Sequence, residues 1–403
     1  MAIEDREWPR LSGRVPSSLT PTILAVTQRE ARGRGAVDLT VTNPTTCGFD
    51  YPRRLAEILA RAATRPYEPD PRGPATTREA IARSGPVPMD PDRVVVTAST
   101  SESYGLLLRT LCDPGDPVAV ARPGYPLLDQ LATQDGVPTL GCRWRWGGGR
   151  WELDLGSVER ALAGGARALF MVSPNNPTGS VLSESEALGL RERCDAQGIP
   201  LVVDEVFWPY GSGAQRAVSV VERPGLDPHD GAPLVILDGL SKRLALPQIK
   251  LGWMTVFGDP RAARRLMDGL THVNDAYLSA STPAHGVAEA LLPRWPVTDQ
   301  ILGRLEGNEI ILRDALADAP EVSVGPREGG WMILVRVPAV RSDEDWALWL
   351  ARQAGVLVAP GFLYDLDTGC WLVVSLLAPE GVFGEGARRL VAGVRAGLAS
   401  VGA

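Results

Sequence analysis

Six short apolar runs, rich in valine and leucine, recur along the middle of the chain and limit most strongly what it can fold into. They occupy residues 93–99, 117–123, 168–174, 200–207, 233–241 and 251–258. Continuous apolar runs of this length are typical of strands that are buried on both faces. Helical patterns lie between several of them, for example at 101–112 and 183–198. The alternation predicts an α/β fold with a mostly parallel sheet that helices cover.

The C-terminal part of the chain follows a different pattern. A long helical pattern at 297–318 precedes short strand-like runs at 331–338 and 370–377. This order indicates a second, smaller α+β domain. We therefore expect a large domain over residues 46–290 and a small C-terminal domain over 291–403. Residues 1–45 are expected to form an N-terminal arm and part of the small domain.

Composition and charge narrow the classes of function. The 403 residues are 44% hydrophobic and 22% charged, which suits a globular protein with a large core. The net charge of −7, without a basic block, argues against nucleic acid or an anionic membrane as a partner. No apolar run approaches the roughly 20 residues of a membrane span. The N-terminal stretch MAIEDREWPR lacks an apolar signal core, so we expect a cytoplasmic protein.

The cysteines and histidines form no recognisable site in the sequence. Five cysteines are scattered without CxxC spacing, and the three histidines show no metal-ligand spacing. This pattern argues against a disulfide framework, a zinc site and a histidine-based catalytic triad, so no metal is expected.

Polar residues stand at the ends of four of the predicted strands. They occupy positions 97–100, 173–176, 204–205 and 241–242. Ligands of open α/β sheets bind beyond the carboxyl ends of the strands. Each stretch alone is compatible with an ordinary strand-to-loop transition, but the four together indicate a ligand site.

Lys242 and Asp204 are the candidates for chemistry at these strand ends. A lysine near the end of a buried strand is placed for a lowered pKa and so for a Schiff base, although a solvated loop lysine gives the same pattern. Asp204 ends an apolar run, where a carboxylate needs a partner or changes its protonation state. Such an aspartate suits the protonated nitrogen of a pyridine ring, whereas a helix cap or a surface acid is the alternative.

Two further stretches either bind a ligand or are purely structural. Ser99 and Glu102 fit the S/T-x-x-E capping box before an apolar helix, and the free N–H groups of such a helix bind phosphate well. Capping alone also explains this pattern. The stretch SPNNPTG, from Ser173 to Gly179, directly follows an apolar run. It is either a simple loop at a strand end or a loop that points Asn176 into a ligand site.

In combination, these stretches resemble the pyridoxal-phosphate enzymes of the aminotransferase fold, known as fold type I or the class I and II aminotransferases. The resemblance covers roughly residues 40–390 and rests on the motifs YEPDPRG, VVVTASTSE, CDPGDPVAVARPGYP, SPNNPTG, PLVVDEVF and GLSKRLALPQIKLGW. The separations of 28 positions from Asn176 to Asp204 and of 8 from Lys242 to Lys250 match the family. The resemblance implies a seven-stranded, mostly parallel sheet in a large cofactor-binding domain, and a homodimer with shared active sites.

The family pattern implies a role for each residue of this sequence that matches it. Lys242 forms the Schiff base with pyridoxal 5′-phosphate and then transfers the proton. Asp204 pairs with the pyridine nitrogen, Asn176 binds the 3-oxygen of the ring, and Tyr125 stacks on the ring. Tyr67 reaches the phosphate of the neighbouring subunit. The phosphate of the cofactor in the same subunit is held by Ser99, Thr100, Ser241 and Lys250.

Three positions depart from the family pattern. Lys250 stands where the family usually has an arginine, so the phosphate loses a bidentate partner. Phe207 stands where a tyrosine usually helps to hold the 3-oxygen. Val373 stands where an arginine usually clamps the substrate carboxylate, and the sequence names no replacement. Trp331 is either a bulky residue that faces the site or a core residue.

The resemblance implies an amino acid:2-oxo acid aminotransferase. The missing arginine and the phenylalanine leave a second hypothesis open, in which the same cofactor serves β- or γ-elimination or replacement, cyclisation or C–C bond formation, with S-adenosylmethionine as one candidate substrate. A third hypothesis is a non-catalytic regulator built on this fold, although no basic DNA-binding segment is visible. The sequence identifies neither the amino donor, nor the acceptor, nor the pathway.

Overall fold

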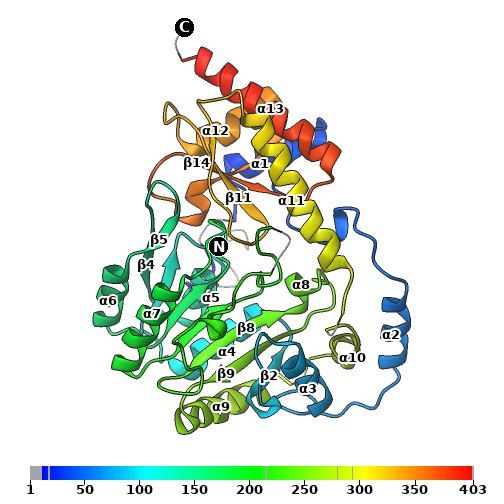
Figure 1. Cartoon of the computed structure of the whole chain (residues 1–403), viewed down its shortest axis with the longest axis vertical. Helices are drawn as coiled ribbons and strands as arrows, with labels where there is room; N and C mark the ends of the chain where they lie inside the picture. The colour runs from blue at the N-terminus through cyan, green and yellow to red at the C-terminus, as the bar shows by residue number, and fades with distance from the viewer. Residues whose placement is uncertain (1–10, 17–18, 214–215, 279, 293, 402–403) are drawn as a thin grey trace, which may run out of the picture.

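An eight-stranded sheet forms the centre of the larger part of the molecule (Figure 1). This structure is a computed structural model that describes residues 11–16, 19–213, 216–278, 280–292 and 294–401. From one edge to the other, the strands are β2 (Val94–Thr97), β9 (Gly252–Phe257), β8 (Leu234–Gly239), β7 (Leu201–Asp204), β6 (Leu169–Val172), β3 (Val118–Arg122), β4 (Thr139–Trp146) and β5 (Trp151–Leu153). Strands β9 and β5 run against the direction that the others share.

The predicted α/β fold with a mostly parallel sheet is confirmed, but the sheet has eight strands where seven were expected. All six predicted strands are present within the predicted ranges. The sequence pattern missed β4, in which buried Cys142 and Trp144 alternate with exposed Arg143 and Arg145. Such alternation indicates a strand that is covered on one face only, and β5 pairs with it as a hairpin.

Helices cover both faces of this sheet, because successive strand residues point to opposite sides. On one face, Val120 and Val202 pack beneath α4 (Thr100–Leu111), α5 (Leu127–Asp135) and α9 (Pro260–Asp275). On the other face, Ala119 and Val203 pack beneath α6 (Leu155–Ala163) and α7 (Glu184–Gln197). At the β2 edge, α10 (Thr282–Leu291) packs against α2 (Arg54–Ala62) and α3 (Ala75–Ser84). The single turn α8 (Leu240–Arg243) directly follows β8.

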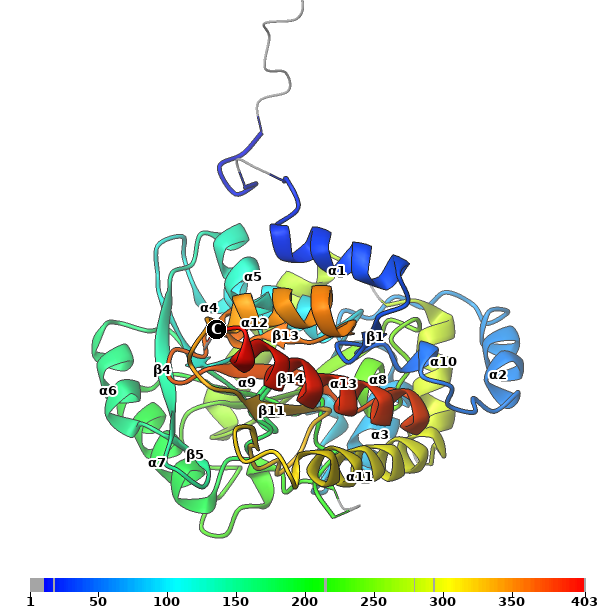
Figure 2. The ribbon, with the colours of Figure 1, turned by 90° about the horizontal axis from the view of Figure 1, so that it is seen from above.

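The C-terminal part contains a four-stranded antiparallel sheet in the order β10 (Ser323–Val324), β11 (Met332–Arg336), β14 (Trp371–Ser375) and β13 (Ala359–Pro360). Helix α13 (Glu380–Ala399) packs along α11 (Val297–Leu316), and it also contacts α12 (Asp343–Trp349) (Figure 2). A separate parallel pair joins β1 (Val37–Asp38), which follows α1 (Ile23–Gly33), to β12 (Val356–Leu357). The remaining short elements are 3₁₀ turns at Pro44–Thr46, Pro91–Arg93, Val220–Glu222 and Gly361–Tyr364 and a π-helical segment at Leu350–Ala354.

The boundaries 1–45, 46–290 and 291–403 stay predictions. Residues 1–10 and 17–18 of the expected N-terminal arm lie outside the described residues. The pairing of β1 with β12 joins the N-terminal segment to the C-terminal part. Across the described part of the chain, the helices lack the combination of length and apolarity that a membrane span requires.

Candidate active site

A cavity of about 420 Å³ lies between the carboxyl ends of the parallel strands and the C-terminal part of the chain. Strands β2, β6, β7 and β8 all end at this edge of the sheet, as expected for strands that run in one direction. The topology therefore brings together residues that are far apart in the sequence. The predicted residues that line the cavity are Ser99, Thr100, Tyr125, Asn176, Asp204, Ser241, Lys242 and Lys250.

Lys242 lies in α8, directly after the buried strand β8. Its backbone carbonyl accepts a hydrogen bond from Tyr210 Oη at 2.7 Å, which fixes the start of the side chain. Two aromatic rings face its amine: Nζ lies 5.0 Å from the ring centroid of Trp331 and 5.9 Å from that of Phe207. Burial lowers the pKa of Lys242 below its ordinary value, against the raising effect of Asp204. The amine is therefore prepared to lose its proton and act as a nucleophile.

The carboxylate of Asp204 is buried at the end of β7. Its Oδ1 accepts a hydrogen bond from Val206 N at 3.0 Å, and its Oδ2 accepts one from Tyr104 Oη at 2.7 Å. Burial raises the pKa of Asp204 to about 6, although both hydrogen bonds lower it. Within the described residues no salt bridge neutralises this carboxylate, so it suits a cationic group that enters the cavity.

The N-terminus of α4 forms the second part of the site. Ser99 Oγ accepts a hydrogen bond from Glu102 N at 3.1 Å, so the predicted N-cap is present. The Glu102 carboxylate accepts from Ala98 N, one residue before the cap, so the second bond of the predicted capping box is displaced by one residue. In this cap Ser99 Oγ is an acceptor, which leaves its hydroxyl proton available. Gly252 lies against the same turn: a Cβ atom there would come within 2.7 Å of Thr100 N. The first N–H groups of the helix carry its positive dipole end.

The two asparagines of the SPNNPTG loop have different tasks. Asn175 holds the loop, because its Oδ1 accepts hydrogen bonds from the backbone N and the hydroxyl of Thr178 and its Nδ2 donates to the Pro123 carbonyl. Asn176 lines the cavity, and its Oδ1 is buried without a hydrogen-bond partner among the described residues. The carboxamide of Asn175 thus stabilises the loop, whereas that of Asn176 is available to a ligand.

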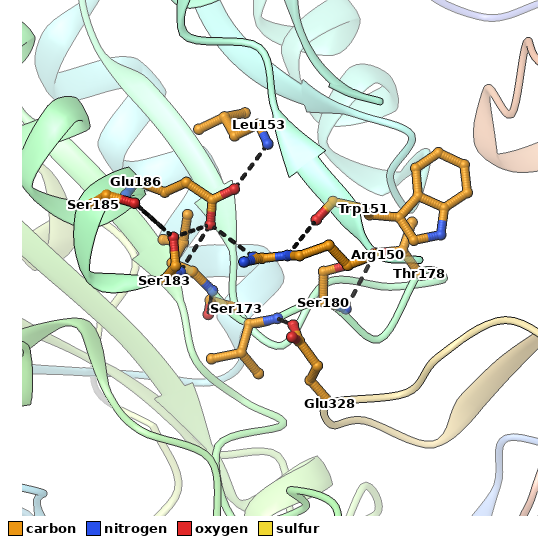
Figure 3. A network of polar contacts seen from close by, with 12 residues as sticks. Arg150, Trp151, Leu153, Ser173, Thr178, Ser180, Ser183, Ser185, Glu186 and Glu328 are labelled. Atoms are coloured by element: carbon orange, nitrogen blue, oxygen red, sulfur yellow. Dashed lines mark hydrogen bonds and ion pairs between the residues drawn. The ribbon is translucent and has the colours of Figure 1, made fainter. Parts of the chain in front are cut away.

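A polar network outside the cavity holds residues 180–183, which directly follow this loop (Figure 3). Glu186 accepts hydrogen bonds from the backbone of Leu153 and Ser183, and it pairs with Arg150. On the other side, Glu328 of the C-terminal part accepts a hydrogen bond from Val181 N at 2.8 Å. The segment that directly follows the Asn176 loop is therefore fixed from both parts of the molecule.

Tyr67 lies outside this cavity, in contrast to the other predicted site residues. Its side chain is 60% exposed on the single chain, next to a smaller hollow that Arg65, His285 and Glu289 help to line. The role implied for Tyr67 is in the neighbouring subunit's site, which a single chain does not test.

Comparison with known proteins identifies the family. A family model described as aminotransferase class I and II matches residues 53–379, which is most of the chain. The chain belongs to this family. This aminotransferase is 28% identical to the valine–pyruvate aminotransferase of Mycobacterium tuberculosis, over 91% of this chain and 93% of that protein. It is 25% identical to the aspartate aminotransferase of Geobacillus stearothermophilus, over 87% of this chain and 91% of that protein.

Solved structures show the same fold. The alanine aminotransferase from Pyrococcus furiosus superposes with a TM-score of 0.85 at 22% identity, and the match covers 96% of this chain and 100% of that one. The aminotransferase fold predicted from the sequence motifs is thereby confirmed. The chain is an enzyme of the transferase class that acts on an amino acid, and the named relatives do not favour the elimination or bond-forming alternative.

The class I and II aminotransferases use pyridoxal phosphate, and the cavity of this aminotransferase fits that group. Asn176 Oδ1 is a buried polar atom without a partner, and Asp204 is a buried carboxylate without a salt bridge among the described residues. The Asp204 carboxylate suits a protonated ring nitrogen, and the carboxamide of Asn176, whose Oδ1 has no partner, can donate to the 3-oxygen from its Nδ2 group. Lys242 and Lys250 are the only lysines in the sequence, and both line the cavity.

The three departures from the family pattern have distinct positions. Lys250 lines the cavity and has a left-handed backbone with φ 60°. Phe207 packs edge-to-face on Trp331 with ring centroids 5.4 Å apart. Val373 is 1% exposed within β14 and is not part of the cavity lining. Of the described cations that do line the cavity, Arg122 is already paired with Asp129 and Asp365. No unpaired guanidinium in the described lining thus replaces the family's arginine.

Several residues that line the cavity carry no sequence motif that indicates a role. Tyr104 was visible only as part of a helix, although a tyrosine within an apolar helix face usually indicates a buried hydroxyl that needs a partner. Trp331 is both a core residue and a cavity-lining residue, since its side chain is 1% exposed and its ring faces Lys242. Met332 and Tyr364 also line the cavity, and no local motif marks them.

Proposed function

We propose that this aminotransferase transfers an amino group between an amino acid and a 2-oxo acid with pyridoxal 5′-phosphate bound covalently at Lys242. The observation that carries the proposal is that one cavity holds both the half-buried amine of Lys242 and the buried carboxylate of Asp204. When bound, the cofactor withdraws the electron pair that the substrate's α-carbon keeps after it loses its proton. Lys242 Nζ moves that proton.

The remaining residues orient the cofactor and the substrate. Asp204 holds the ring nitrogen protonated, because a negative carboxylate in a buried site stabilises the ring's positive charge. Asn176 binds the 3-oxygen of the ring, and Tyr125, which is 54% exposed on the single chain, stacks on the ring. The phosphate lies at the N-terminus of α4, where helix amides and side chains converge. The phosphate-binding side chains are Ser99, Thr100, Ser241 and Lys250.

We further propose that the enzyme is a cytoplasmic homodimer in which Tyr67 reaches the partner's phosphate. The resemblance to the family supports this arrangement, and the Tyr67 side chain, 60% exposed on the single chain, is free to reach a partner. Sedimentation of the purified protein measures the oligomeric state. Tyr67→Phe is expected to weaken cofactor binding without changing the sedimentation coefficient.

The experiment that tests the reaction is the absorption spectrum of the purified protein before and after addition of single amino acids. For transamination, an amino donor converts the bound cofactor to its amino form, and a 2-oxo acid restores the first spectrum. Consumption of an amino acid or of S-adenosylmethionine without that conversion would instead indicate elimination or bond formation.

The site of attachment has an unusually clean test. The holoprotein is reduced with borohydride, digested and analysed by mass spectrometry. Since the sequence has only two lysines, the label is expected on the peptide that contains Lys242 and not on the peptide with Lys250. A label on Lys250, or none, would contradict the proposal.

A further inference from the structure

The phenol of Tyr104 makes a direct hydrogen bond to the cavity carboxylate of Asp204. Tyr104 lies in the first turns of α4 and is buried, with its ring packed on Phe170 at a centroid distance of 5.8 Å. Its Oη donates to Asp204 Oδ2 at 2.7 Å. The bond therefore connects α4 with β7. The N-terminus of α4 is proposed to bind phosphate, and β7 carries the proposed partner of the ring nitrogen.

The two hydrogen bonds of Asp204 fix the orientation of its carboxylate. Val206 N is bonded to Oδ1 and Tyr104 Oη to Oδ2, so each oxygen is held by one donor. A carboxylate offers about four lone-pair sites, and therefore lone pairs remain free on both oxygens. Since Asp204 lines the cavity, the free lone pairs are available to a donor inside it.

We propose that Tyr104 is a positioning residue that holds the Asp204 carboxylate charged and oriented toward the ring nitrogen of the cofactor. This inference rests on the proposed function for the identity of the cofactor. A bond to a charged acceptor is stronger than one between neutral groups, and a fixed acceptor loses no rotational freedom when the ring arrives. A purely structural tyrosine would only fill the core and satisfy its own hydroxyl.

The surroundings keep Tyr104 a donor and Asp204 an acceptor. Burial and the charge of Asp204 raise the pKa of Tyr104 well above its usual value, so the phenol keeps its proton. Other charged groups act on Asp204 from neighbouring elements: Asp238 on β8 raises the pKa of Asp204, and Lys242 on α8 lowers it. The hydrogen bond from Tyr104 also lowers that pKa and favours the carboxylate.

The test compares Tyr104→Phe with Tyr51→Phe by titrating cofactor into the protein. Tyr104→Phe removes only the hydroxyl and keeps the ring on Phe170. In the control, Tyr51 likewise loses one phenol hydrogen bond, of 2.7 Å to the Ala245 carbonyl, but it does not line the cavity. Tyr104→Phe is expected to weaken cofactor binding by about tenfold to one-hundredfold, the value of a bond to a charged group. Tyr51→Phe is expected to leave it unchanged.

A double-mutant cycle shows whether Tyr104 acts through Asp204. In an Asp204→Ala background, Tyr104→Phe is expected to cause no further loss of affinity. An equal loss in both backgrounds, or unchanged affinity in the single variant, would overturn the proposal. If Tyr104→Phe does not fold, 3-fluorotyrosine at position 104 keeps ring and hydroxyl as a stronger donor, and cofactor is then expected to bind at least as tightly as to the native protein.

A second readout does not depend on the cofactor. In the cofactor-free protein, the raised pKa of Asp204 makes stability fall as pH rises from about 4 to about 6, because the folded state binds the proton more tightly. Without the Tyr104 donor this pKa is higher, so the fall in melting temperature is expected to continue to higher pH. Buried Glu205, whose pKa is about 8, contributes equally to both proteins. Identical pH profiles would overturn the Tyr104 proposal even where the cofactor assignment stands, and a protein that binds no pyridoxal phosphate would overturn only that assignment.

Discussion

The two walls of the cavity differ in their polar groups. The sheet wall carries Ser99, Thr100, Asn176, Asp204, Ser241 and Lys242 at strand ends and at the N-terminus of α4, among apolar side chains such as Phe170 and Val206. The C-terminal wall, formed by Trp331, Met332 and Tyr364, consists of large and mostly apolar side chains. The sheet wall offers the fixed donors and acceptors that one cofactor requires. The C-terminal wall offers shape, which suits discrimination between substrates.

The walls meet where segment 328–330 packs against the SPNNPTG loop. Gly329 N donates to the Gly179 carbonyl at 2.9 Å, and Gly330 N donates to the Tyr210 carbonyl at 2.7 Å. The next residue of this segment is Trp331. The indole of Trp331, which covers Lys242, is therefore positioned by backbone hydrogen bonds to the sheet wall. Substitutions on each wall and at the junction between them test the difference between the walls.

The largest effect is expected on the sheet wall, from Lys242→Ala. Without this amine the protein has no covalent attachment and no proton-transfer group, so kcat is expected to fall at least about 10³-fold. Stopped-flow spectra that follow the conversion of the cofactor to its amino form by an amino donor measure the loss. Lys250→Ala is the matched control, since it removes the only other lysine and leaves the proton-transfer group in place. Equal losses in the two variants would contradict the assignment of Lys242.

The sheet wall could be predicted from the sequence more fully than the C-terminal wall. Asp204 and Lys242 each follow a buried strand, and parallel strands bring their ends to one edge, so local motifs and topology together place them. On the C-terminal wall, the sequence left open whether Trp331 faces the site or belongs to the core. Tyr364 reaches the cavity through the packing of the two parts of the molecule, which no local pattern encodes. For the same reason the Tyr104–Asp204 bond, between residues 100 positions apart, required the structure.

The fold itself followed the same rule. Strands with continuous apolar runs were predicted, whereas β4 was missed because only one of its faces is covered. The roles carried over from the family at Ser99, Tyr125 and Lys250 stay predictions, although all three line the cavity. The substrate partner that replaces the missing arginine is not visible in either wall.

On the C-terminal wall, Trp331→Phe is expected to change substrate preference. The smaller ring widens the cavity beside Lys242, so kcat/KM for bulky aromatic donors is expected to rise relative to alanine by about tenfold. Trp346→Phe is the matched control: this indole is also buried in the C-terminal part, bonds the Pro338 carbonyl, and does not line the cavity. Unchanged preference in Trp331→Phe would show that the indole belongs to the core alone.

At the junction between the walls, Gly329→Ala is expected to lower the free energy of unfolding and to weaken cofactor binding. An added Cβ atom would lie 2.5 Å from Pro174 Cγ and 3.0 Å from the Tyr210 carbonyl, so the loop must shift at a cost of about 1–3 kcal/mol in the free energy of unfolding. Because Pro174 lies in the loop of Asn176, cofactor binding is expected to weaken as well. In Gly303→Ala, which meets no atom within 4 Å inside α11, the same change is expected to stabilise by about 0.5–1 kcal/mol. Denaturant unfolding distinguishes the two.

The smallest effect is expected from Lys250→Arg, which restores the residue usual in the family. An arginine can bind two phosphate oxygens with its planar fork, whereas the lysine binds as a point charge. Since Lys250 is exposed on the single chain, water screens much of this gain, and cofactor is expected to bind only about three- to tenfold more tightly. Lys250→Ala is expected to shift the dissociation constant in the opposite direction by a similar factor.

The dissociation constants of both variants are measured by titrating pyridoxal phosphate into the cofactor-free proteins at two salt concentrations. Weaker binding by the arginine variant would contradict this prediction. It would indicate that the left-handed backbone at position 250 directs an arginine side chain away from the phosphate, so that the site fits lysine by shape as well as by charge.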